Sequence, residues 1–170
     1  MDIALRFIFY ILRKVLLIFL VIILVGITFF ATRDVANIYI VVNEGLKNRT
    51  SAILEQNIDV DFLGRFFSDS FLNEDELLNN NIYSDYNIYS YRQRIRARLF
   101  WVWPWSNSAK IFAEHTVSDL IGEPKNITEG LKEPPEWESG LKEIILKRNM
   151  GRWQIDSMRL IEPLNPLGDP

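Results

Sequence analysis

Apolar residues fill the first 32 positions of the chain almost completely, whereas the remaining positions mix apolar and polar residues. Residues 15–32 are 18 consecutive positions without a charge. As a helix with a rise of about 1.5 Å per residue, this run would be about 27 Å long, close to the hydrocarbon thickness of a bilayer. The pattern therefore predicts one transmembrane helix over residues 15–32.

Charges at the two ends of this run predict its direction. Arg13 and Lys14 precede it directly, whereas Arg33 lies beside Asp34 at the other end. Because cytoplasmic flanks carry the excess of Lys and Arg, we expect residues 1–14 in the cytoplasm and the rest of the chain on the extracytoplasmic side. The sequence thus predicts a single-pass protein of the cell membrane.

A cleaved signal peptide is the competing interpretation of the apolar segment. The uncharged run is longer than the apolar core of such a peptide, and Phe29 and Phe30 stand where a cleavage site needs small residues. An uncleaved signal anchor fits the sequence better.

Helical periodicity continues beyond the uncharged run. Apolar residues recur at helical spacing in the next segment, namely Val35, Tyr39, Val42, Leu46 and Ile53. They predict a juxtamembrane helix over residues 33–57 that is continuous with the domain. This stripe can pack on the domain's own sheet, or it can form a seam between two copies of the chain.

Residues 58–162 are predicted to fold as an extracytoplasmic α+β domain, and residues 163–170 to form an irregular tail. Short helices are expected over residues 59–80, where Asn73 and Glu76 resemble a capping box. The acidic residues around this position lack the spacing of a calcium loop, so we expect a solvated turn.

Alternation of apolar and polar positions predicts a long antiparallel hairpin in the middle of the domain. Its first strand ends at Trp103, before Pro104, and its second strand begins at Ala109. Pairing Trp103 with Ala109 sets Arg98 opposite Glu114 on the polar face. A shorter hairpin is predicted nearer the C-terminus, with strands over residues 141–147 and 153–160.

Four arginines fall on the polar face of the first strand, namely Arg92, Arg94, Arg96 and Arg98. Such a face could bind an anionic partner, either lipid headgroups or an acidic protein. The alternative is a solvated face with cross-strand acids, in which each exposed ion pair contributes about 0–1 kcal/mol.

His115 is the only histidine of the chain, and the predicted register places it on the apolar face opposite Ala97. It could act as a general base in a pocket with Asp85, or it could be a hydrogen-bonded core residue. One histidine and no cysteine do not make a usual zinc site, so neither a metal nor a cofactor is predicted.

Three tryptophans crowd around Pro104, namely Trp101, Trp103 and Trp105. They could pack under the long loop predicted over residues 122–140, or form an exposed patch for a ligand or partner.

Composition changes this picture little. The 170 residues are 48% hydrophobic with a formal net charge of −3, which gives no argument for nucleic-acid binding. The absence of cysteine excludes disulfide bonds and a thiolate nucleophile.

The order of elements is one long helix, short helices and a bent antiparallel sheet ending in the hairpin ILKRNMGRWQIDSMRL. Over residues 34–162 this order resembles the nuclear-transport-factor-two-like (cystatin-like) cone. The resemblance implies a curved, helix-wrapped antiparallel sheet. Similar domains hang from one membrane helix as scaffolds in bacterial secretion and conjugation assemblies, and others are ketosteroid-isomerase-like enzymes or bind small apolar ligands. No residue set here matches the catalytic pair of those enzymes.

Two functional hypotheses follow. The first is a non-catalytic, membrane-anchored extracytoplasmic interaction or scaffold domain in a bacterial envelope assembly, with other envelope proteins or a second copy as partners. The second is a small-ligand-binding or isomerase/hydrolase-like cone with a pocket around His115.

Overall fold

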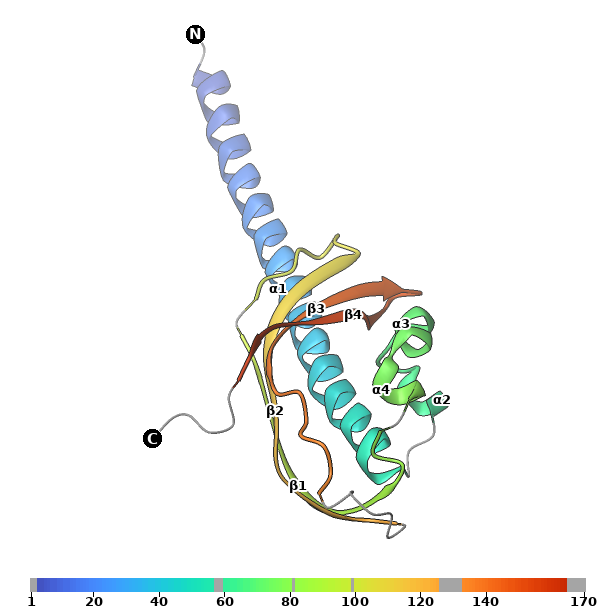
Figure 1. Cartoon of the computed structure of the whole chain (residues 1–170). Coiled ribbons are helices and arrows are strands. Elements are labelled where there is room, and N and C mark those ends of the chain that lie inside the picture. Colours follow the sequence, from blue (N-terminus) through green and yellow to red (C-terminus); the bar gives the residue numbers. More distant parts are fainter. Residues whose placement is uncertain (1–2, 57–59, 81, 99, 126–132, 165–170) are drawn as a thin grey trace, which may run out of the picture.

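The structure is a computed structural model that describes residues 3–56, 60–80, 82–98, 100–125 and 133–164. Figure 1 shows one long helix, three short helices and a four-stranded antiparallel sheet. The predicted α+β class is therefore confirmed.

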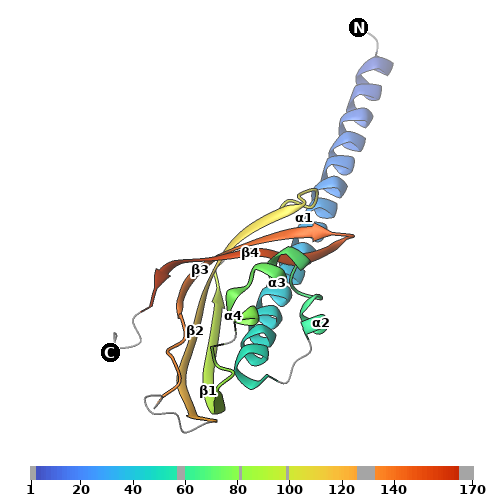
Figure 2. The same ribbon diagram turned by 45° about the vertical axis from the view of Figure 1, so that its right-hand side comes forward.

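The long helix α1 (Ile3–Glu55) contains 53 residues, which corresponds to a length of about 80 Å. Its N-terminal half projects away from the domain and exposes apolar side chains from Phe7 to Phe30. It is the one helix, within the described part of the chain, that is long and apolar enough to cross a membrane. Its C-terminal half lies on the concave side of the bent sheet in both views (Figures 1 and 2).

The sheet is a meander in which consecutive strands are neighbours: β1 (Tyr86–Ala97), β2 (Ser108–Pro124), β3 (Gly140–Asn149) and β4 (Arg152–Pro163). The β3–β4 hairpin forms across the turn that the sequence predicts. Met150 and Gly151 both have positive φ, 47° and 79°, as a tight two-residue hairpin turn requires. The strands on either side, β3 and β4, are three and four residues longer than predicted.

The register of the β1–β2 hairpin differs from the predicted one by two residues. His115 pairs with Ile95, and Ala97 pairs with Ala113. The first strand ends at Ala97 rather than Trp103, because residues 100–107 form a loop instead of extending the ladder. A shift of two keeps every side chain on its predicted face, so the inward and outward assignments still hold.

Three short helices follow α1: α2 (Val60–Leu63), α3 (Asp69–Glu74) and α4 (Glu76–Asn79). The predicted cap at Asn73 is wrong, since Asn73 lies inside α3. Instead, the Ser68 hydroxyl accepts from the backbone N–H of Phe71, and the Asp75 carboxylate accepts from that of Leu77. Asp75 is buried, so the predicted solvated acidic turn is wrong at this residue.

The apolar stripe of α1 belongs to the core of its own domain. Val42, Leu46 and Ile53 have no exposed surface, while Val35 is half-buried and Tyr39 exposed. The helix packs against inward residues of the sheet, which include Ile111, Ile144, Leu146 and Ile155. A dimer seam through Val42, Leu46 and Ile53 is therefore wrong, because the chain's own sheet already covers these side chains.

Candidate functional site

Side-chain contacts of Asp34 form a joint between α1 and the strands β3 and β4, just after the uncharged run ends. The Asp34 carboxylate accepts a hydrogen bond from Nη2 of Arg148 in β3 at 2.5 Å and one from the Trp153 indole N–H in β4 at 3.4 Å. The Arg148 guanidinium also lies 4.6 Å from the Trp153 ring centroid and donates to the Pro104 carbonyl. Sequence spacing does not reveal this joint, because Asp34 and Arg148 lie 114 positions apart in the chain.

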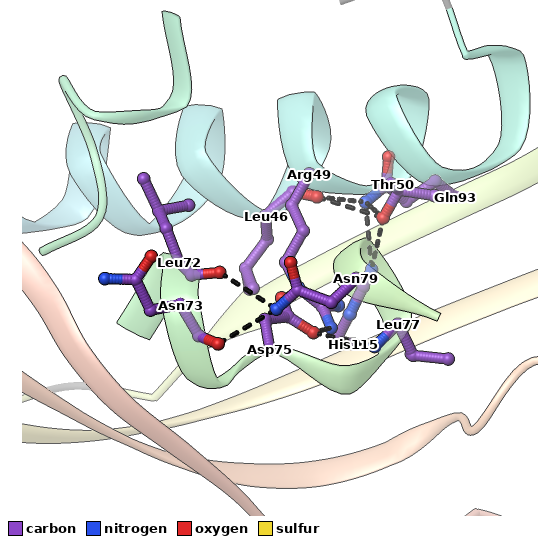
Figure 3. Close-up of polar contacts among 10 residues, drawn as sticks. All are labelled: Leu46, Arg49, Thr50, Leu72, Asn73, Asp75, Leu77, Asn79, Gln93 and His115. Atoms are coloured by element: carbon purple, nitrogen blue, oxygen red, sulfur yellow. Dashed lines mark hydrogen bonds and ion pairs between the residues drawn. The ribbon is translucent and has the colours of Figure 1, made fainter. Parts of the chain in front are cut away.

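A buried ion pair fixes the middle of the domain to α1 (Figure 3). Arg49 donates from Nε and Nη2 to the two carboxylate oxygens of Asp75, at 2.5 and 2.7 Å. This two-point geometry is the strong form of an arginine–carboxylate contact. Asp75 also caps α4, so one carboxylate connects the long helix to the short ones.

His115 lies in the same region and is completely buried. Its Nε2 atom lies 2.9 Å from the Gln93 side-chain nitrogen and 3.4 Å from the Thr50 hydroxyl. Burial, reinforced by the positive charges of Lys142 and Arg49, lowers the pKa of His115 to about 3. The imidazole is therefore neutral at neutral pH and accepts from Gln93, which makes it a core residue that joins α1, β1 and β2.

The structure does not bring Asp85 and His115 together. Asp85 is exposed just before β1 begins, whereas His115 pairs with Ile95, ten positions further along the strand. At about 3.3 Å per residue, the separation along the strand is about 30 Å. The predicted acid–base pair is therefore wrong, and His115 lines none of the pockets described below.

Lys142 projects from β3 into the same buried region. Burial, with the nearby charge of Arg49, lowers its pKa to about 8, an effect that Glu138 and Asp75 partly offset. It lines a pocket of about 320 Å³ together with Arg49, Asp75 and Glu138. Carboxylates from Glu74, Glu76 and Asp156 line the pocket as well, so its charge does not suit an anion.

Three of the arginines, Arg92, Arg94 and Arg96, lie on the solvent face of β1, as the alternation predicts, and Arg98 is exposed one residue beyond the end of the strand. Arg92 pairs with Asp119 at 3.3 Å, and Arg98 with Glu114 at 3.6 Å. Among the residues that the structure describes, no carboxylate forms an ion pair with Arg94 or Arg96. The centre of the stripe thus keeps its charge available.

A groove of about 850 Å³ lies between α1 and β1. The helix contributes polar side chains to it, including Glu44, Lys47 and Ser51, and the strand contributes Tyr91 and Gln93. β1 pairs only with β2 among the described strands, so it is an edge strand. An edge strand beside an open groove can accept an extended segment of another chain.

The three tryptophans of the loop between β1 and β2 form an exposed patch rather than packing under another loop. Trp101, Trp103 and Trp105 retain 56%, 51% and 66% of their accessible surface. They contact one another in sequence, with ring centroids 6.0 and 5.1 Å apart.

Comparisons with family models, with curated proteins and with solved structures find no match for this chain. The resemblance to the nuclear-transport-factor-two-like cone therefore stays a prediction.

Proposed function

We propose that this chain is a non-catalytic, membrane-anchored interaction domain that is held at a fixed height above the bilayer. In this proposal the N-terminal half of α1 spans the cell membrane, and the domain lies on the extracytoplasmic side as part of a bacterial envelope assembly. The observation that carries the proposal is the continuity of α1. One helix supplies both the apolar projecting segment and the core of the domain, without a linker between them.

Rigid attachment favours a scaffold over a freely moving enzyme. A flexible tether would let the domain sample many positions, whereas a continuous helix keeps it at a fixed distance from the membrane. The Asp34 joint strengthens this coupling, because it ties two strands to the helix within two residues of the uncharged run.

The edge strand β1 offers the surface for a partner. An extended segment added beside β1 would place alternate side chains over the groove and over the arginine face. Arg94 and Arg96 lack acidic partners within the described residues. They would therefore favour acidic side chains at those positions of the added segment that lie over the arginine face. The partner class that fits is an envelope protein with an exposed, acidic, extended segment.

Membrane anchoring is tested by alkaline extraction and by labelling from outside the cell. The chain has no cysteine, so Asn87→Cys in the domain is a unique target for an impermeant maleimide. We expect the protein to stay with the membrane and to be labelled in intact cells whose outer layers have been made permeable. Release by alkaline carbonate, or labelling only after lysis, would contradict the proposal.

The partner surface is tested by photo-crosslinking from Ser90, which lines the groove on β1. Crosslinked products are compared between the wild type and the charge reversal Arg94→Glu/Arg96→Glu. A matched control, Arg65→Glu/Arg159→Glu, changes the net charge equally at exposed positions outside β1. We expect the first pair alone to abolish a specific product. Equal products in all three proteins would refute the arginine face as the binding surface.

A further inference from the structure

Residues 100–107, in the loop between β1 and β2, display their three tryptophans in a defined arrangement. Val102, between two of them, is buried in the main core. The backbone N–H of Ser106 donates to the Trp103 carbonyl at 2.9 Å, which closes a turn around Pro104. The Trp103 and Trp105 rings stack with an interplanar angle of 17°. The exposure of these rings is therefore a feature of a structured loop.

This loop is held at the level where the uncharged run of α1 ends. Nη1 of Arg148 donates to the Pro104 carbonyl at 3.3 Å, and the same guanidinium pairs with Asp34. The backbone N–H of Arg148 also donates to the Asn107 carbonyl at 2.8 Å. Both views show the loop beside α1, at the end of the domain from which the helix projects (Figures 1 and 2).

The burial of side chains along α1 independently shows where the domain begins relative to the uncharged run. Ala31 lies inside the uncharged run, yet it has no exposed surface. Ile27, one turn earlier, is half-buried, whereas Phe29 and Phe30 on other faces are exposed. The domain thus begins to cover α1 within the last turns of the apolar segment. If α1 spans a bilayer, this end of the domain lies directly at the bilayer surface.

The tip of the neighbouring β3–β4 hairpin also carries side chains that suit the surface of a bilayer. Met150, in the β3–β4 turn two residues from Arg148, is 98% exposed. Arg33 and Arg152 near this end are exposed and positively charged, whereas the carboxylate of Asp34 is paired with Arg148. This end therefore combines apolar rings and a thioether with cations and a neutralised acid.

We propose that Trp101, Trp103 and Trp105 insert into the lipid headgroup region of the same bilayer that α1 spans. This inference rests on the proposed function, because it requires α1 to be the membrane anchor. Tryptophan favours this region, since its ring is apolar and its indole N–H can donate to lipid carbonyl and phosphate oxygens. None of the three indole N–H groups donates within the described part of the chain, so all are available to lipid.

Two contacts with one bilayer would fix the tilt of the domain. A single helix allows the domain to rock about the membrane surface, and a second point of insertion to one side of the helix opposes that motion. The tryptophan loop would thereby set which face of the domain, including β1 and its groove, is presented to partners.

The test uses the full-length protein in vesicles of phosphatidylcholine and phosphatidylglycerol. An environment-sensitive fluorophore is attached to a single cysteine, either at Asn107→Cys in the loop or at Asn87→Cys at the far end of the sheet. Some vesicles contain lipids with a nitroxide on the headgroup, and others lipids with a nitroxide deep in the acyl chain. We expect the Asn107 probe to emit at shorter wavelength than the Asn87 probe, and to be quenched most strongly by the headgroup nitroxide.

Tryptophan dependence is tested in the Asn107→Cys protein by replacing the three tryptophans with serine. The expected result is emission at longer wavelength and loss of the quenching. Tyr89→Ser, which removes an exposed ring from the far part of β1, is the matched control and should change neither signal. The labelled loop with its native tryptophans decides whether insertion occurs even if the triple variant fails to fold.

The outcomes separate this inference from the proposed function. Protein that resists alkaline carbonate but shows an unquenched, water-like Asn107 probe overturns the loop insertion and leaves the anchor intact. Emission at short wavelength without headgroup quenching means that protein, either a second copy or a partner, covers the rings, and it also overturns the insertion. Protein that carbonate releases overturns the anchor and, with it, both proposals.

Discussion

Acidification should destabilise the domain through His115, because this imidazole is buried in its neutral form. Its pKa is lowered from 6.5 to about 3 by burial and by the charges of Lys142 and Arg49. The unfolded chain therefore binds a proton between these values that the folded chain does not bind. Stability contributed by the neutral group is complete above pH 6.5 and is lost progressively as the pH falls towards 3.

The size of this effect follows from the two pKa values. The full shift corresponds to about 5 kcal/mol, since one pKa unit is about 1.4 kcal/mol. Between about pH 7.5 and about pH 5, the linkage relation gives a loss of about 2 kcal/mol from His115 alone. Lys142 contributes little in this window, because its folded pKa of about 8 and its unfolded value of 10.5 both lie above it.

The assay is urea unfolding of the full-length protein in detergent micelles, followed by tryptophan fluorescence at both pH values. His115→Gln is the matched variant, because glutamine stays neutral and can still hydrogen-bond to Gln93 or Thr50. The carboxylates titrate equally in both proteins, so the difference between the two pH dependences isolates His115. We expect the wild type to lose about 2 kcal/mol more than the variant. Equal losses would refute the assignment of a buried, neutral histidine.

Two further changes test the packing of the domain in the same unfolding assay. Asp75→Asn should cost about 3–5 kcal/mol, because it leaves the buried guanidinium of Arg49 without its counter-charge; a cost below about 1 kcal/mol, typical of an exposed pair, would contradict the buried geometry. Gly140→Ala should cost about 1–3 kcal/mol, since a Cβ atom there would meet the backbone oxygen of Glu162. Gly26→Ala, where nothing lies within 4 Å of the added carbon, is its control, and equal effects of the two substitutions would refute the close approach.

Period-two alternation predicted the faces of the sheet but not its register. It placed His115 inward and the four arginines outward, and both placements hold. Shifting the β1–β2 pairing by two leaves each face unchanged, so the pattern cannot distinguish the predicted Ala97–His115 pair from the observed Ile95–His115 pair. The register depends on the length of the loop between the strands. The predicted loop was too short because aromatic residues at alternating positions, Trp101 and Trp103, resemble a continuing strand.

The buried charges were missed because polar residues are usually solvated. Nevertheless, the sequence carries a signal for two of them, Arg49 and Lys142. Arg49 lies three residues after Leu46 and four before Ile53, which places it on the buried face of α1. Lys142 alternates with Ile144 and Leu146 on the inward face of β3 in the same way. The identity of Asp75 as the partner of Arg49 could not be read from such spacing, because it depends on how α3 and α4 pack.

Polar contacts between α1 and the rest of the domain hold the helix in place in a way that apolar packing alone would not. A long apolar helix can slide or rotate on a sheet at little cost, since leucine and isoleucine side chains are nearly interchangeable in a core. α1 is instead bonded at Asp34, at Arg49 and Thr50, and at Glu55, which accepts from the Tyr91 hydroxyl. These points cover 22 residues, or about 30 Å of helix. Because hydrogen bonds and ion pairs are lost on a shift of one residue, they fix the register of the sheet on the helix. They would thereby fix the height of the domain above the membrane, which is the property that a scaffold on a rigid anchor requires.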